Sequence, residues 1–231
     1  MRKILVFTAT YNEYPNIKIL VPKILINYPS LDILVVDDNS TDGSKEYLLQ
    51  IKKKFKRIKI FIRPKKMGLN TAHKLAFNYA KKKYAYLITM DADLSHDTKY
   101  IRKIIKLLKK NDFVIGSRYM DGGGCGYKGF RLYLSYFGNK FIKFILGLQI
   151  NEFTTSYRGF NLTRLKRINL KKIKSRGYSF FLETIFLINK MGYKIKEFPI
   201  FFKNRNKGKS KIEKIEVLRF FYNLFRLKFF Y

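Results

Sequence analysis

The chain is poor in the residues that build many metal and redox sites. Its 231 residues include one cysteine, Cys125, and two histidines. A single cysteine excludes an internal disulfide framework and a cysteine-rich zinc or iron–sulfur centre, and two histidines exclude a histidine-rich metal site. No uncharged apolar run reaches about 18 residues, and the apolar run near the N-terminus is too short for a signal peptide. We therefore expect a reduced, cytoplasmic protein without a membrane-spanning helix.

Acidic residues are also scarce. Against 49 Lys and Arg the chain has only 16 Asp and Glu, so its formal net charge is +33. Solvated surface lysine explains much of this charge, and attraction to nucleic acid or to an anionic membrane face could explain the rest. The 22 Phe and 17 Tyr exclude a disordered polycation. Because the basic residues are spread along the chain and no nucleic-acid-binding motif is present, we expect an anionic membrane surface as partner and no specific nucleic acid.

Short apolar runs alternate with amphipathic stretches in the first half of the chain. Runs rich in Ile, Val, Leu, Phe and Tyr have the composition of buried strands. They are Lys3–Thr10, Asp32–Asp38, Ile58–Pro64, Tyr84–Asp93 and Asp112–Arg118. Between them, the stretches Lys45–Phe55 and Tyr100–Lys110 have the start signal or the apolar spacing of helices. The alternation predicts an α/β fold with a mostly parallel open sheet, which binds ligands at the carboxyl ends of its strands.

The second half is less regular. After a glycine-rich loop at residues 122–126, the pattern predicts helices at Phe130–Leu148 and Tyr178–Met191 and a strand at Tyr193–Phe202. A basic loop, Lys203–Lys211, then leads to a predicted terminal helix, Lys214–Tyr231. We expect one main domain, residues 1–212, followed by an amphipathic segment, residues 213–231.

The terminal helix has two kinds of side chain on different faces. One stripe is polar and consists of Glu216, Arg219, Asn223 and Arg226. The apolar residues away from it are Leu218, Phe221, Phe225 and Phe229. This pattern is typical of a helix that lies in a membrane interface. A helix that packs on the main domain is the alternative.

Seven of the 16 acidic residues fall just after three predicted strands. They are Glu13, Asp37, Asp38, Asp42, Asp91, Asp93 and Asp97. Bunched carboxylates repel one another and need a counterion, a donor-rich ligand or a metal. Capping of a turn or helix explains Asp42, and it explains Asp37 as well as a ligand would. It does not explain Asp91 and Asp93, whose spacing at a strand end predicts two carboxylates on one face, suited to Mg²⁺ or Mn²⁺.

Three motifs occur in a characteristic order: TYNE at residues 10–13, VVDDNSTDG at 35–43 and MDADLSH at 90–96. Further matching segments are residues 116–119, 154–158, 177–180 and 205–211. On these segments the chain resembles the family 2 glycosyltransferases of the GT-A fold, a Rossmann-like, mostly parallel open sheet with helices on both faces. Within that family it resembles the polyprenol-phosphate (dolichyl-phosphate) mannosyltransferases. Ala9, Asn70 and Glu152 depart from the usual Pro, Gly and Asp.

The resemblance implies a nucleotide-sugar donor, GDP-mannose by default, and a divalent metal ion. The residues that would hold the base and ribose are Tyr11, Glu13, Val36 and Asp38. Asp91, Ala92 and Asp93 would line the diphosphate, with Asp93 and Asp91 as the Mg²⁺ or Mn²⁺ ligands. Arg118 would also contact the donor, and Arg205 and Lys211 would close over its phosphates.

The resemblance also implies a polyprenyl phosphate acceptor. Arg131, Ser135 and Asn139 recur every four residues and share one helix face, and Arg118 arrives from a strand end. Guanidinium groups bind phosphate in a bidentate way, so Arg118, Arg131 and Ser135 form the expected acceptor-phosphate site. The alternative is that Arg131, Ser135 and Asn139 are only the solvent-exposed polar face of an amphipathic helix. A phosphate monoester is largely ionised at neutral pH and needs no general base. The catalytic residues are therefore expected to be Asp91, Asp93 and Arg118, with neither histidine involved.

The resulting hypothesis is an inverting, metal-dependent transfer of mannose from GDP-mannose to a polyprenyl phosphate. The protein would lie on the cytosolic face of a membrane as a peripheral protein, with a membrane-protein partner as a further candidate. One alternative keeps the fold but uses another nucleotide sugar, such as UDP-glucose, or a glycan hydroxyl acceptor. Another is a non-catalytic protein that binds nucleic acid or an anionic surface.

Overall fold

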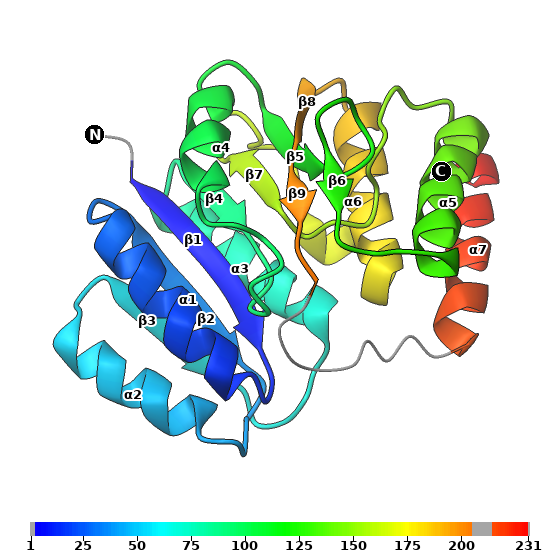
Figure 1. The fold of residues 1–231 in the computed structure, drawn as a ribbon. Coiled ribbons are helices and arrows are strands. Elements are labelled where there is room, and N and C mark those ends of the chain that lie inside the picture. Colours follow the sequence, from blue (N-terminus) through cyan, green and yellow to red (C-terminus); the bar gives the residue numbers. More distant parts are fainter. Residues whose placement is uncertain (1–2, 205–213, 231) are drawn as a thin grey trace.

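Seven strands form one sheet in the middle of the protein (Figure 1). The computed structural model describes residues 3–204 and 214–230. The strands are β1 (Ile4–Thr10), β2 (Asp32–Asp37), β3 (Ile58–Ile62), β4 (Tyr86–Thr89), β5 (Phe113–Ser117), β7 (Arg158–Asn161) and β8 (Ile195–Pro199). Their order is β3-β2-β1-β4-β7-β5-β8, and only β7 runs against its neighbours. The predicted mostly parallel sheet is confirmed.

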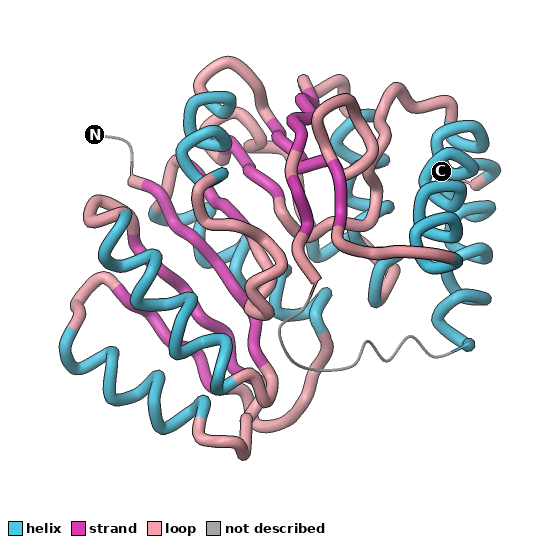
Figure 2. Tube along the Cα trace, viewed as in Figure 1, coloured by secondary structure: helices cyan, strands magenta, loops and turns pink. Residues whose placement is uncertain are grey.

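Helices cover both faces of this sheet, as Figure 2 also shows. One apolar cluster contains α1 (Tyr14–Asn27), α2 (Ser44–Lys54) and α4 (Tyr100–Leu108). The other contains α3 (Leu69–Lys83), α5 (Phe130–Leu146), α6 (Gly177–Lys190) and α7 (Lys214–Phe229), with the short 3₁₀ helix η1 (Leu170–Lys172). Two short strands, β6 (Gly124–Cys125) and β9 (Phe201–Phe202), pair separately. The helices predicted around residues 45–55, 100–110, 130–148, 178–191 and 214–231 are confirmed within a few residues at their ends.

Two strand predictions were wrong in ways that matter for the site. The run Tyr84–Asp93 leaves the sheet after Thr89, so the DAD motif lies in a bend beyond β4 and not in an extended strand. The run Tyr193–Phe202 divides into two strands: β8 ends at Pro199, and Phe201–Phe202 form β9 in the separate small sheet.

Strand β7 was missed because its sequence, RGFN, has no apolar alternation. Its glycine is required by packing, since a Cβ at Gly159 would lie 2.5 Å from the Cγ2 atom of Ile104 on α4.

The terminal helix packs on the domain. Leu224 and Leu227 of α7 are fully buried in the cluster that contains α6. The guanidinium of Arg226 lies 2.6 Å from the carboxylate of Glu183, which is fully buried on α6. In the part of the chain that the structure describes, no helix is both long enough and apolar enough to cross a bilayer. Residues 205–211 of the predicted basic loop lie outside the described residues.

Candidate functional site

Three loops at the carboxyl edge of the sheet contain residues whose backbone conformation is unusual. Among the described residues, the non-glycine residues with positive φ are Asn12 (56°), Asn39 (62°) and Leu94 (64°). They follow β1, β2 and β4 respectively. Asparagine tolerates this conformation, but for leucine it is strained, and such strain gathers at functional sites. The carboxyl edge at β2, β1 and β4 is therefore the candidate site.

The loops after β1 and β2 are tied together. The Asn12 N–H donates to Ser40 Oγ (2.9 Å), and the Thr41 N–H donates to Asn12 Oδ1 (2.9 Å). Beside them Tyr11 is 40% exposed, with the Lys66 ammonium 4.9 Å from its ring centre. An exposed ring at this edge can stack on a nucleobase, and the role predicted for Tyr11 stays a prediction.

The other residues predicted to hold the nucleoside are less open. Glu13 is the residue just before α1, and its carboxylate accepts a hydrogen bond from Asn16 Nδ2 (2.5 Å). Val36 lies inside β2 with its side chain fully buried in the apolar core, so it would act by fixing the strand and not by side-chain contact. Ala92 is buried beside the acidic motif.

Asp38 is paired inside the protein. Its Oδ1 atom accepts from the guanidinium of the buried residue Arg63, and its Oδ2 atom accepts from the Met67 N–H (3.1 Å). A nucleoside would therefore compete with Arg63 for this carboxylate. Arg63 is not marked by any local sequence signal, because it lies 25 residues after its partner Asp38.

Two of the bunched acids are structural. Asp37 accepts from Ser40 N (2.9 Å) and from Ser40 Oγ (2.5 Å). Asp42 accepts from Tyr14 N (2.8 Å) and from Ser44 N (3.1 Å), at the starts of α1 and α2. Capping accounts for both residues.

The acidic motif after β4 is held by serines on two sides. Asp93 is buried, and its Oδ1 atom accepts from Ser95 N (3.1 Å) and from Ser95 Oγ (2.5 Å). Asp91 is half-buried, and its Oδ1 atom accepts from Ser156 Oγ (2.5 Å), just before β7. The structure therefore fixes both carboxylates where β4 and β7 meet. Ser156 was not singled out as a site residue, although it lies within the matching segment 154–158.

His96 supports this motif as a neutral ring. Its Nδ1 atom lies 3.0 Å from the Asp91 main-chain N–H, which can only donate, so Nδ1 accepts and the ring proton lies on Nε2. That nitrogen is 3.3 Å from Thr155 Oγ1. Burial lowers the pKa of His96, although Asp91 and Asp93 act in the opposite direction. His96 therefore orients the Asp91 backbone and is not placed as a proton acceptor.

The donor atoms at this motif suit a hard divalent cation. They are carboxylate oxygens, the ligands that Mg²⁺ and Mn²⁺ prefer. The described residues contain no group of three or more His, Cys, Asp or Glu side chains that could hold a metal alone. Two carboxylates completed by substrate phosphate oxygens are a normal Mg²⁺ site. The residues therefore fit a metal that binds together with the donor.

Arg118, just after β5, is bound to Glu152. Arg118 Nε lies 2.6 Å from Glu152 Oε2, and Arg118 Nη2 lies 2.8 Å from Glu152 Oε1. Both side chains are buried. Burial alone would raise the pKa of Glu152, but the Arg118 charge and hydrogen bonds hold it below its ordinary value. Glu152 was noted only as a departure from the family pattern, and the structure makes it the partner of the predicted catalytic arginine.

Of the residues on α5 that were predicted to bind the acceptor phosphate, Ser135 is connected to Arg118 through Tyr119. The Tyr119 hydroxyl donates to Ser135 Oγ (2.6 Å), and the Arg118 guanidinium lies over the Tyr119 ring, 4.8 Å from its centre. Asn139 is buried, and its Oδ1 atom accepts from the Phe153 N–H (2.8 Å). Arg131 lies in α5, but its side chain is outside the described part.

The basic loop begins beside the acidic motif. The Lys203 N–H donates to the Ser95 carbonyl (3.0 Å), and the Lys203 ammonium lies 3.1 Å from Asp97 Oδ2. Arg205 and Lys211, predicted to close over the donor phosphates, lie outside the described residues. The anchoring of Lys203 places the start of their loop next to Asp93.

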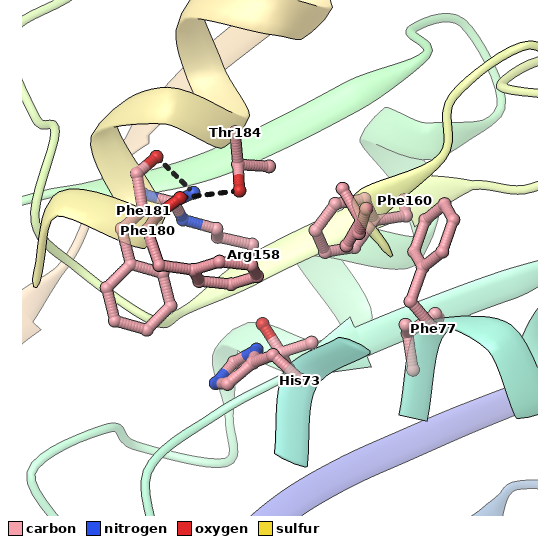
Figure 3. Close-up of a pocket in the computed structure, with 10 residues that line it drawn as sticks. His73, Phe77, Arg158, Phe160, Phe180, Phe181 and Thr184 are labelled. Carbon is pink, nitrogen blue, oxygen red and sulfur yellow. Dashed lines mark hydrogen bonds between the residues drawn. The ribbon is translucent and has the colours of Figure 1, made fainter. Parts of the chain in front are cut away.

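A small cavity lies between α3, β7 and α6 (Figure 3). Its volume is about 10 Å³, enough for roughly one water molecule. Arg158 lines it and donates to the carbonyls of Thr155, Phe181 and Phe153 (2.8–3.0 Å). The arginine of the 154–158 segment therefore joins that segment to α6, and the cavity is too small for a substrate.

His73 also lines this cavity and makes stability depend on pH. Burial and the Arg158 charge lower the pKa of His73 to about 3, from an ordinary 6.5. As the pH falls from 6.5 towards 3, the unfolded chain binds a proton that the folded protein rejects. The free energy of unfolding should fall by up to about 1.4 kcal/mol per pH unit for this group. Urea unfolding of His73→Phe across this range should show a shallower pH dependence than the wild type, and equal slopes would contradict the assignment.

Comparison with known proteins identifies the family. The model of the family described as Glycosyl transferase family 2 matches residues 5–168. An undecaprenyl-phosphate mannosyltransferase of Micrococcus luteus is 31% identical over 212 residues, which cover 91% of this chain and 87% of the relative. A polyprenol monophosphomannose synthase of Mycolicibacterium smegmatis is 32% identical over 215 residues, which cover 91% of this chain and 81% of the relative.

Solved structures agree on the fold. Glucosyl-3-phosphoglycerate synthase from Mycobacterium tuberculosis, in complex with Mn²⁺, UDP and glucosyl-3-phosphoglycerate, has a TM-score of 0.70 at 13% identity, covering 98% of this chain and 80% of that one. The mannosyltransferase PcManGT from Pyrobaculum calidifontis, in complex with GDP-Man and Mn²⁺, has a TM-score of 0.61 at 18% identity, covering 90% of this chain and 58% of that one. At these identities they show the GT-A fold alone. The family match over residues 5–168 and the two relatives, each more than 30% identical over 91% of the chain, show that the chain belongs to glycosyl transferase family 2 and is a glycosyltransferase.

Proposed function

We propose that the protein transfers mannose from GDP-mannose to a polyprenyl phosphate, with inversion at the anomeric carbon and with Mg²⁺ or Mn²⁺. The observation that carries this proposal is the match, over 91% of the chain, to two relatives named as undecaprenyl-phosphate mannosyltransferase and polyprenol monophosphomannose synthase. A UDP sugar is the second candidate donor, because a structural neighbour binds UDP at the same kind of fold.

On the donor side, Asp91 and Asp93 would hold the metal together with the diphosphate. When bound, the ion offsets the charge that develops on the departing nucleoside diphosphate. Ser156 and Ser95 hold the two carboxylates, and His96 holds the Asp91 main chain. Tyr11 would stack on the base, and Arg205 and Lys211 would reach the phosphates from the basic loop.

On the acceptor side, the reaction needs cations and not a base. A phosphate monoester has its second pKa near 6 and is already a dianion in part at neutral pH. One of its oxygens would form the bond to the sugar carbon as the bond from that carbon to the diphosphate breaks, so no proton has to leave. Arg118, Arg131 and Ser135 would bind this phosphate, and Tyr119 joins Arg118 to Ser135.

The direct test offers purified protein GDP-mannose or UDP-glucose, each with a polyprenyl phosphate and Mn²⁺. We expect a mannosyl lipid that mild acid hydrolyses, as a glycosyl phosphate should be. A product formed with UDP-glucose and not with GDP-mannose would show that the proposed donor is wrong. Transfer to a sugar hydroxyl, with none to the lipid phosphate, would show that the proposed acceptor is wrong.

Replacing Arg131 by alanine should weaken the acceptor site. We expect KM for polyprenyl phosphate to rise about tenfold or more, since a charged hydrogen bond contributes about 1.5–3 kcal/mol. The affinity for GDP-mannose, measured by calorimetry, should stay unchanged. Lys140→Ala, on the same helix, serves as the control. A loss of donor affinity in Arg131→Ala with a normal acceptor response would reassign the residue.

A lipid acceptor fits one further surface, the aromatic plate. We give this name to twelve large apolar side chains of α5 and the α7 region that are 40–83% exposed. They are Phe130, Tyr133, Leu134, Phe137, Phe141, Phe144, Leu218, Phe221, Tyr222, Phe225, Phe229 and Phe230. The two helices lie side by side in Figure 1, and the rings of Phe141 and Phe221 are 6.2 Å apart. We propose that this plate rests on the cytosolic face of an anionic membrane, as an extension of the contact expected of residues 213–231 alone.

Vesicle flotation tests the plate. Phe137→Ser with Phe144→Ser should reduce binding to anionic vesicles at high salt, where screening removes the charge term but not the apolar term. Ile19→Ser with Ile26→Ser, two exposed apolar residues on α1, should have no effect. Transfer to a short, water-soluble acceptor should be unchanged in both variants. Equal flotation of all three proteins at every salt concentration would place the membrane contact elsewhere.

A further inference from the structure

The segment 151–153, defined as Asn151, Glu152 and Phe153, is held by a carboxylate from the far edge of the sheet. Glu197 of β8 accepts the Glu152 N–H at Oε1 (3.0 Å). Its Oε2 atom accepts both the Asn151 N–H (3.0 Å) and Asn151 Nδ2 (2.9 Å). Three donors of one short segment therefore converge on one side chain.

Helix α5 holds the same segment from the other side. Lys143 Nζ donates to Asn151 Oδ1 (3.0 Å), and Asn139 Oδ1 accepts the Phe153 N–H (2.8 Å). The segment is thus fixed between β8 and the helix that carries the residues predicted to bind the acceptor phosphate.

The segment 151–153 contains Glu152, the partner of Arg118. The Glu152 side chain is fully buried and grips Arg118 through two hydrogen bonds of 2.6 and 2.8 Å. A bidentate pair fixes the plane of the guanidinium as well as its position. Any shift of the main chain at Glu152 therefore moves the Arg118 guanidinium with it.

We infer that Glu197 is a positioning residue for Arg118, acting through the main chain of Asn151 and Glu152. This deepens the proposed function, because it concerns an arginine of that site, but it does not depend on which sugar is transferred. Glutamine cannot replace Glu197, since it offers one acceptor oxygen and an NH₂ group where the segment presents three N–H donors. At least one buried N–H would lose its partner and the segment would shift.

The main experiment compares Glu197→Gln with Asp112→Asn. Asp112 Oδ2 accepts the Lys194 N–H (2.8 Å) at the amino end of the same β5–β8 pair, whose carboxyl end bears Arg118, so it is a matched carboxylate away from the site. A misplacement of about 1 Å can cost on the order of 100-fold in rate. We expect kcat to fall 10- to 100-fold in Glu197→Gln, with GDP-mannose affinity unchanged, and to stay at the wild-type level in Asp112→Asn.

A double-mutant cycle separates positioning from general damage. If Glu197 acts through Arg118, Glu197→Gln should lower kcat/KM much less in an Arg118→Ala background than in the wild type. An equal factor in both backgrounds would overturn the inference.

A measurement without turnover keeps the inference testable if the proposed function fails. Hydrogen exchange at the Arg118 Nε–H, followed by NMR, should be slow in the wild type and in Asp112→Asn and at least tenfold faster in Glu197→Gln. Unchanged exchange in Glu197→Gln would show that Glu197 does not hold the pair. Absence of turnover with every donor and acceptor would refute the function alone.

Discussion

Replacing Glu152 by alanine should destabilise the fold by about 3–5 kcal/mol and abolish turnover. The change leaves the buried Arg118 guanidinium without its partner, and removing one member of a buried ion pair strands the other charge. It also takes an acceptor from the N–H groups of Thr154 and Thr155 (3.0 and 3.1 Å). Urea unfolding and the transfer assay measure the two effects separately.

Controls for this prediction come from the same pair. Glu152→Asp keeps the charge with a shorter side chain and should lose less stability than alanine. The double variant Glu152→Ala with Arg118→Met should recover stability but not turnover, because no buried charge is then left unpaired. Wild-type stability in Glu152→Ala would mean that the ion pair does not hold this edge of the sheet.

Acid should weaken the same pair. The pKa of Glu152 is held below its ordinary value, so its contribution to stability is full above that ordinary value and is lost as the pH falls through the lower folded-state pKa.

The second large effect is expected at the acidic motif. Asp93→Ala should reduce turnover by roughly 1,000-fold or more, since a metal site provides several kcal/mol of transition-state stabilisation. Stability should change little, by about 1–2 kcal/mol, because Ser95 loses one acceptor. The assay is run with Mg²⁺, with Mn²⁺ and in excess EDTA. Full activity in EDTA would remove the metal from the mechanism.

An exposed acid supplies the control. Glu46→Ala, on α2, removes the same charge away from the site and should keep both activity and stability. Asp93→Asn keeps the shape of the side chain but removes its charge. If this variant stayed active, Asp93 would not be a metal ligand.

The sequence predicted the frame of the site because its signals are local. Apolar runs located β1, β2, β4 and β5, and the parallel sheet brought Tyr11, Asp91 and Arg118 to one edge. What it missed depends on distant partners. Asp38 is paired with Arg63, and Arg118 with Glu152. No local spacing reveals such pairs.

The terminal helix shows another limit. Helical spacing separated the polar stripe from the aromatic face, but it could not say which side turns inward. In the structure Arg226 of the polar stripe pairs with buried Glu183, while Phe225 and Phe229 are 43% and 68% exposed. The inward side also carries the fully buried Leu224 and Leu227, so it combines apolar packing with one charge pair whose partner lies on another helix.

Strand β7 has a consequence for how the protein is made. It lies between β4 and β5 in the sheet but follows both in the chain. During synthesis the half that bears Asp91 and the half that bears Arg118 therefore emerge without a shared strand, and neither can pair with the other. Only when residues 156–161 have left the ribosome can Ser156 bond Asp91 and the ladder close. Strand β8, whose Glu197 accepts the Glu152 N–H, follows later still, so the site is complete only after residue 199 has been made.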